Sequence, residues 1–115
     1  MHIDEYRFGR IVIDDVAYRD DVTILAARVI APWWRKAGGH VFAAEDLGEV
    51  LAAAPEIVVL GTGALGMVNV PEATLARLGS AGSRVIVART ATAVEEYNRL
   101  VAEGHDVAAC LHLTC

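Results

Sequence analysis

The first third of the chain alternates short apolar runs with polar turns, a pattern typical of β-strands. Residues 11–18 centre on the pair Asp14-Asp15, and this arrangement predicts a β-hairpin with a tight acidic turn. Two further apolar runs, 22–25 and 28–31, are candidate strands bounded by acidic residues and by proline.

After residue 40 the apolar period changes. Three segments repeat apolar residues at helical spacing and carry helix start or stop signals: 45–54, 71–82 and 90–104. Thr90 or Thr92 is expected to cap the last of them. Three continuous apolar runs predict strands that are buried on both faces: 57–60, 84–88 and 107–113. The strand–helix–strand–helix–strand order predicts parallel pairing with right-handed crossovers. We therefore expect a single α/β domain over residues 1–115, with a mixed, largely parallel sheet and an N-terminal antiparallel hairpin extension.

Composition narrows the classes of partner. Hydrophobic residues make up 55% of the 115 residues, which favours some apolar surface left for a protein partner or a second copy. The net charge is −5 and the longest basic run is Arg35-Lys36, so we do not expect nucleic-acid binding. No apolar run approaches the ~20 residues that span a bilayer. The first residues lack the pattern of a signal peptide, and we expect a cytoplasmic location.

The cysteines predict reduced thiols. In an extended chain, Cys110 and Cys115 would lie ~16 Å apart at ~3.3 Å per residue, beyond disulfide reach. Together with His112 they offer three soft metal ligands, but structural zinc normally uses two such knuckles, so we expect no metal. Cys115 near His112 could supply a nucleophile and a base, but a residue at the C-terminus is expected to be mobile, so we predict no catalytic thiol.

A glycine-rich turn, Gly61-Thr62-Gly63-Ala64-Leu65-Gly66, follows the run 57–60 and spells G-x-G-x-x-G. A dinucleotide site needs a helix that starts at these glycines and an acid after the next strand. Here the first helix signal is Pro71, and the next strand ends in Ala88-Arg89-Thr90. We therefore expect no dinucleotide cofactor, although the Gly-Thr-Gly turn can form a backbone N–H nest for a small anion.

The loop 33–40 holds two tryptophans, two cations and a histidine between the β-rich and the helical parts. Such loops carry binding residues when the scaffold is rigid. The alternative is that one tryptophan fills the core and the rest is a solvated turn. The candidate ligand-binding residues from this loop, the glycine turn and the following segment are Trp34, Arg35, His40, Thr62, Gly63 and Thr90.

Several motifs together resemble the Mth-domain family: Trp34-Arg35, Gly39-His40, the segment 57–63, Val70-Pro71, Thr90-x-x-Ala93-Val94-x-x-Tyr97-Asn98-x-Leu100-Val101-x-x-Gly104 and His112-x-Thr114-Cys115. That family includes the adipogenesis-associated Mth-domain protein and, more distantly, a mitochondrial respiratory complex I assembly factor. The resemblance implies a three-layer α/β fold with a central mixed sheet, and binding or assembly modules without established enzymatic activity. Gly66 departs from the family's pattern, and because we expect no mitochondrial targeting segment, a role in complex I assembly does not carry over by itself.

Two hypotheses follow. The leading one is a non-enzymatic binding or assembly module that acts through contacts with a protein partner or with a second copy, without a cofactor. The alternative is a small-molecule or anion-binding enzyme or sensor, whose pocket would be formed by Trp34, His40 and the Thr62-Gly63 turn. This alternative predicts that these side chains converge in one concave site.

Overall fold

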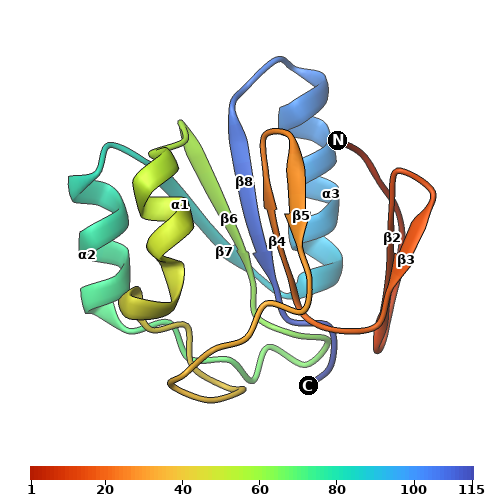
Figure 1. Cartoon of the computed structure of the whole chain (residues 1–115), viewed down its shortest axis with the longest axis horizontal. Helices are drawn as coiled ribbons and strands as arrows, with labels where there is room; N and C mark the ends of the chain where they lie inside the picture. The colour runs from red at the N-terminus through yellow and green to blue at the C-terminus, as the bar shows by residue number, and fades with distance from the viewer.

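A five-stranded sheet forms the centre of the computed structural model, which describes residues 1–115 (Figure 1). Its strand order is β5-β4-β8-β6-β7. The strands are β4 (Val22–Leu25), β5 (Arg28–Ile30), β6 (Ile57–Gly61), β7 (Arg84–Ala88) and β8 (Val107–Leu111). Strand β6 pairs in parallel with both β7 and β8, whereas β4 pairs antiparallel with β8 and β5. The predicted mixed α/β sheet is confirmed, with parallel and antiparallel pairings in equal number.

A smaller antiparallel sheet is built from β1 (Ile3–Arg7), β2 (Arg10–Ile13) and β3 (Val16–Tyr18). The predicted hairpin is confirmed as β2–β3, and its turn residues Asp14 and Asp15 have φ of +47° and +68°, as a tight primed turn requires. Strand β1 was not predicted, because only Ile3 among its five residues is buried and its sequence therefore shows no apolar run.

Helices cover both faces of the large sheet, which gives three layers. The short 3₁₀ helix η1 (Ala44–Leu47), α1 (Gly48–Ala53) and α2 (Glu72–Ser80) lie on one face. Helix α3 (Thr90–Ala102) and the small sheet lie on the other (Figure 1). Strand β6 serves both cores, since Val58 and Leu60 pack toward α1 and α2 while Ile57 and Val59 pack toward α3.

Some predicted boundaries are wrong. The helix expected at 45–54 is the 3₁₀ turn η1 followed by the short α1, and β8 ends at Leu111 rather than at residue 113. Helix α3 starts at Thr90 without a side-chain cap, so the predicted capping role of Thr90 or Thr92 is wrong. Both cysteines are free, as predicted. None of the helices has the length and apolar content needed to cross a membrane.

The topology brings several loops to one end of the sheet. The carboxyl ends of β5, β6, β7 and β8 all point to the lower end of Figure 1, where the C-terminal residue also lies. Segments 31–43, 62–71 and 112–115 meet there. Ligands in open α/β sheets bind outside strand carboxyl ends, so this end is where a functional site is expected.

Candidate functional site

The two tryptophans of the loop after β5 have opposite environments. Trp33 is 8% exposed, packs against Phe42 with ring centroids 5.0 Å apart, and donates from its indole Nε1 to the Asp46 carbonyl at 3.0 Å. Trp34 is 75% exposed. Trp33 is thus the core residue foreseen for this loop, and Trp34 is left free for contact.

Arg35 is a buried cation, with 4% of its side chain exposed. Its Nη2 lies 2.9 Å from Asp21 Oδ2, and the guanidinium also donates to the carbonyls of Gly38 and Gly39. The guanidinium stacks 4.7 Å from the centre of the Trp33 ring. Burial of a charge is costly unless it is paired and hydrogen-bonded, so these contacts fix the course of the loop around Arg35.

Asp21, which precedes β4, is the centre of this polar cluster. Its carboxylate accepts hydrogen bonds from the Leu113 amide at 2.9 Å and from His112 Nδ1 at 2.7 Å, in addition to Arg35. Burial by itself raises the pKa of Asp21, but the hydrogen bonds from His112, Leu113 and Arg35 outweigh burial, and the pKa lies below its usual value. The cluster therefore favours a charged Asp21.

His112 continues the cluster toward solvent. Because a carboxylate only accepts hydrogen bonds, Nδ1 of His112 carries the proton, and its Nε2 lies 3.2 Å from Thr114 Oγ1. The ring of His40 stands edge-on to that of His112 with centroids 5.6 Å apart. His40 is exposed, and its ring borders the polar cluster without joining it through a hydrogen bond.

An open pocket of about 420 Å³ lies beside the cluster. It is lined by residues from the segment before β4, the loop after β5 and the C-terminal segment: Arg19, Asp20, Asp21, Pro32, Trp33, Trp34, Arg35, Gly38, Gly39, His112, Leu113 and Thr114. Of the six predicted site residues, the pocket gathers Trp34 and Arg35. His40, Thr62, Gly63 and Thr90 lie outside its lining, so the convergence that the small-molecule hypothesis predicted is incomplete.

Thr62, Gly63 and Thr90 make hydrogen bonds within the protein. Thr62 Oγ1 donates to the Ala88 carbonyl, and the Gly63 amide donates to Thr90 Oγ1 at 2.9 Å. The Thr90 hydroxyl in turn donates to the His112 carbonyl at 2.6 Å and is completely buried. These three residues tie the ends of β6, β7 and β8 together.

The glycine turn holds the C-terminal segment. Ala64 donates its amide to the Thr114 carbonyl at 2.7 Å, and Met67 donates to the Cys115 carbonyl at 3.0 Å. Gly63 has φ +104°, and a Cβ there would lie 2.4 Å from the carbonyl carbon of Cys115, so only glycine fits. Helix α2 starts only at Glu72, and not at the glycines as a dinucleotide site requires. Most of the backbone donors that would hold a pyrophosphate are thus paired within the protein, with carbonyls or with the Thr90 hydroxyl.

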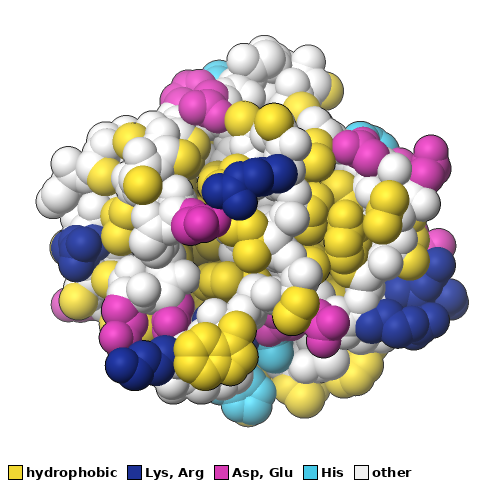
Figure 2. Space-filling model, viewed as in Figure 1, with side chains coloured by type: hydrophobic (Ala, Val, Ile, Leu, Met, Phe, Trp, Pro, Cys, Tyr) yellow, Lys and Arg dark blue, Asp and Glu magenta, His cyan; other side chains and the backbone are white.

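Four large apolar side chains are exposed around this C-terminal segment: Phe8 (62%), Trp34 (75%), Leu65 (62%) and Met67 (60%). We call them the apolar face. The residue after Phe8, Gly9, donates to the Leu113 carbonyl, and Trp34 shares a pocket with Thr114. Figure 2 shows hydrophobic and histidine side chains together along the lower edge, where the loops gather in Figure 1.

Cations without an ion pair border the apolar face. Arg19 lines the same pocket as Trp34, and Lys36 follows Trp34 by two positions in the loop. The Arg89 side chain lies 3.4 Å from the position of a Cβ on Gly66, between Leu65 and Met67. None of these three cations is within ion-pair distance of a carboxylate, although the chain as a whole is acidic.

Sequence reasoning missed Asp21 as a site residue. The pair Asp20-Asp21 reads as a turn signal, and His112 as a possible metal ligand or base. The two residues are 91 positions apart and meet because β4 pairs with β8. Knowledge of the strand order is the signal that would have found the cluster.

Comparison with known proteins places these features in a family. The family model described as "Protein of unknown function (DUF498/DUF598)" matches residues 3–112. The solved structure named MT938 is similar at TM-score 0.83 and 27% identity, over 99% of this chain and 98% of that one. A Bartonella henselae structure, named as an outer membrane protein, is similar at TM-score 0.84 and 26% identity, over 98% of this chain and 94% of that one. A Bordetella pertussis protein, named as a Mth938-like domain, shares the fold at TM-score 0.68 and 20% identity, over 97% of this chain and 85% of that one. The resemblance to the Mth-domain family is confirmed.

Proposed function

Since the chain belongs to the DUF498/DUF598 family, whose function is unknown, its role has to be inferred from its own surface, and we propose that it is a protein-binding module. The observation that carries this proposal is the apolar face: four large hydrophobic side chains, each more than half exposed, around one C-terminal segment. Scattered exposed hydrophobics are ordinary, but a group of them on one surface marks an interaction site.

The support beneath the apolar face suits a binding surface. Trp34 follows a tryptophan buried in the core, and Leu65 and Met67 stand on a turn whose amides bond the C-terminal segment. A preorganised surface loses little side-chain and loop freedom on association, which favours affinity. Tryptophan is also among the residues that most often dominate the free energy of protein interfaces.

The charges around the apolar face specify the partner. Arg19, Lys36 and Arg89 border it without ion pairs. Of the two acidic residues in the adjoining pocket, Asp21 is already paired with Arg35, which leaves Asp20. We infer a partner segment that inserts apolar side chains and presents carboxylates to these cations. Electrostatic complementarity of this kind raises association rates and excludes wrong partners.

No catalytic step is assigned to Asp21, His112 and Thr114 in this proposal. Asp21 Oδ2, which faces His112, is also 2.9 Å from Arg35, so its charge is already balanced. An aspartate that serves a histidine base in catalysis needs that charge to stabilise the imidazolium. We propose instead that the cluster fixes the C-terminal segment under the apolar face.

The proposal is tested by selecting peptides from a random display library on the immobilised protein. We expect enriched peptides that combine large apolar residues with Asp or Glu. Their affinity should fall at least tenfold, roughly 1.4 kcal/mol, in the double variant Leu65→Ser/Met67→Ser. The matched control is Val16→Ser, which changes another exposed apolar residue, beside the β2–β3 turn, and should leave affinity unchanged.

Three outcomes would overturn the proposal: no enriched peptide, enriched peptides without acidic residues, or equal binding to the double variant. A concentration-dependent dimer that Leu65→Ser/Met67→Ser abolishes would assign the apolar face to a second copy of the chain instead.

A further inference from the structure

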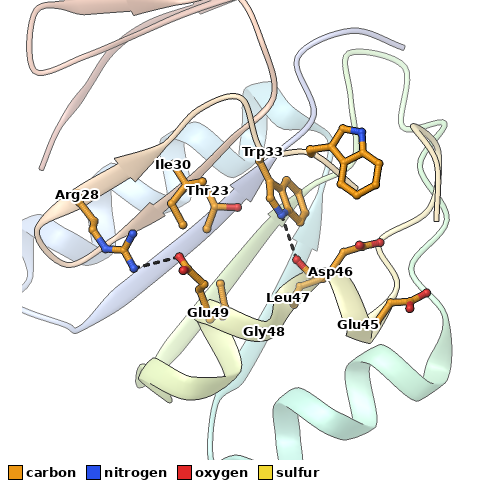
Figure 3. A pocket seen from close by; sticks show the side chains of 11 residues that line it. Thr23, Arg28, Ile30, Trp33, Glu45, Asp46, Leu47, Gly48 and Glu49 are labelled. Carbon is orange, nitrogen blue, oxygen red and sulfur yellow. Dashed lines mark hydrogen bonds and ion pairs between the residues drawn. The ribbon is translucent and has the colours of Figure 1, made fainter. Parts of the chain in front are cut away.

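A second pocket lies between the β4–β5 hairpin and the segment that forms η1 and the start of α1 (Figure 3). Its volume of about 400 Å³ is in the range of small-molecule sites. Figure 3 shows Thr23 and Ile30 on one wall, Leu47 and Glu49 on the other, and the Trp33 indole at one end. The pocket is thus bounded by regular structure on both sides.

Thr23 contributes an unsatisfied polar group to this pocket. Its side chain is 2% exposed, and Thr23 Oγ1 has no hydrogen-bond partner in the protein. The Cys110 thiol lies across from it on β8, and a thiol is only a weak hydrogen-bond partner for a hydroxyl. The neighbouring lining from Ile30, Leu47 and Val50 is apolar. A buried hydroxyl without a partner is costly, so a ligand that reaches Thr23 with a hydrogen-bonding group gains by pairing it.

The rim of the pocket is acidic. Glu45, Asp46 and Glu49 line it, and Arg28 is the one cation among the lining residues. Arg28 pairs with Glu49 at 3.0 Å, whereas Glu45 forms no ion pair. The Asp46 carboxylate accepts hydrogen bonds from the amides of the 36–37 segment. The net negative rim therefore favours a cationic ligand over an anionic one.

The indoles reinforce this preference. Arg35 already covers one face of Trp33, at 4.7 Å from the ring centre, and its charge is balanced by Asp21. Trp34 also lines the pocket and, being exposed, offers a free indole face. An ammonium group near an indole gains cation–π attraction in addition to its attraction to carboxylates.

We propose that this pocket binds a small molecule with an apolar body, an ammonium group at one end and a hydroxyl at the other. The body packs against Leu47 and Val50, the ammonium lies toward the acidic rim and the Trp34 indole, and the hydroxyl pairs with Thr23 Oγ1. The site takes a ligand class different from the acidic peptide of the apolar face, and shares only Trp34 with that face. Tyramine is the simplest probe with this chemistry.

The test follows the two indole N–H signals in ¹H–¹⁵N spectra during titration, because the chain has only two tryptophans. Tyramine should shift them saturably. 2-Phenylethylamine lacks the hydroxyl and should bind about tenfold more weakly, the loss expected for one hydrogen bond. 4-Hydroxyphenylacetate, which replaces the ammonium with a carboxylate, should give no saturable shift.

Two variants separate the two ends of the ligand. Thr23→Val should reduce tyramine affinity to that of 2-phenylethylamine and leave the latter unchanged. Glu45→Gln should weaken both amines equally, and Glu72→Gln on α2, with the same change in charge, should weaken neither. Because a buried hydroxyl without a strong partner is costly, Thr23→Val should unfold at the same urea concentration as the wild type or at a higher one, so a loss of affinity would not reflect a loss of the fold.

The proposal is overturned if tyramine gives no saturable indole shift, if 4-hydroxyphenylacetate binds as tightly as tyramine, or if Thr23→Val and Glu45→Gln both leave tyramine affinity unchanged. None of these outcomes bears on peptide binding by Leu65 and Met67, so the two proposals fail separately.

Discussion

Replacing Asp21 with alanine tests the polar cluster that fixes the C-terminal segment. The variant leaves the Arg35 guanidinium, 4% exposed, without its carboxylate, and removes the acceptor of the Leu113 amide. Removing one partner of a buried ion pair costs roughly 3–5 kcal/mol. Asp21 keeps 18% of its side chain exposed, so we expect the lower end, about 3 kcal/mol. That is a large share of the roughly 5–15 kcal/mol by which native domains are stable.

The assay is urea unfolding followed by far-ultraviolet circular dichroism, which does not depend on Trp33 beside the cluster. Asp20→Ala is the matched control, because this neighbouring carboxylate is exposed and forms no ion pair; it should lie within about 0.5 kcal/mol of the wild type. A double-mutant cycle with Arg35→Met should show a coupling of at least about 1 kcal/mol, since the two side chains are in contact. The reasoning is refuted if Asp21→Ala costs less than about 1 kcal/mol, or if the two substitutions are additive.

Three further predictions follow from the same region. The pKa of Asp21 lies below its value in the unfolded chain, so the ionised carboxylate stabilises the fold. This stabilisation is complete above about pH 4 and is lost as the pH falls through the folded pKa. The difference in unfolding free energy between the wild type and Asp21→Asn should therefore shrink between about pH 7 and about pH 2. Burial raises the pKa of Cys110 to about 12, so a thiol reagent at pH 8 should modify Cys115 alone until urea is added, and Cys115→Ser should remove the fast reaction. Gly63→Ala should cost at least about 2 kcal/mol and expose the Met67 amide to hydrogen exchange, whereas Gly79→Ala in α2, with open space around its Cβ, should be neutral or stabilising.

The second half of the chain was predictable because its local patterns agree with its tertiary structure. The run 57–60 is buried on both faces of the sheet, as a continuous apolar run predicts, and helices α2 and α3 end before Gly82 and Gly104. Strand β1 was not predictable in this way. It is held by pairing with β2 and by Asn98, which exchanges two hydrogen bonds with the backbone of Ile3.

The candidate site, like the fold, was predictable only where local sequence patterns decide it. Trp34 and Arg35 stood out because two indoles and two cations in a short loop are unusual. The functional environment of Arg35 depends on Asp21 and His112, which only the pairing of β4 with β8 brings together. Thr62, Gly63 and Thr90 were singled out by a motif, and their contacts are internal hydrogen bonds between strand ends. Binding of a ligand by these residues stays a prediction.

The apolar face is tested most directly by photo-crosslinking in the cell that produces the protein. A photoreactive phenylalanine analogue is placed at Leu65 in the face, or at Val16 beside the β2–β3 turn as a control that is also more than half exposed. The account predicts one discrete crosslinked partner from position 65, none from position 16, and loss of the crosslink when Arg89 is changed to glutamate. Equal crosslinking from both positions, or none from position 65, would contradict it.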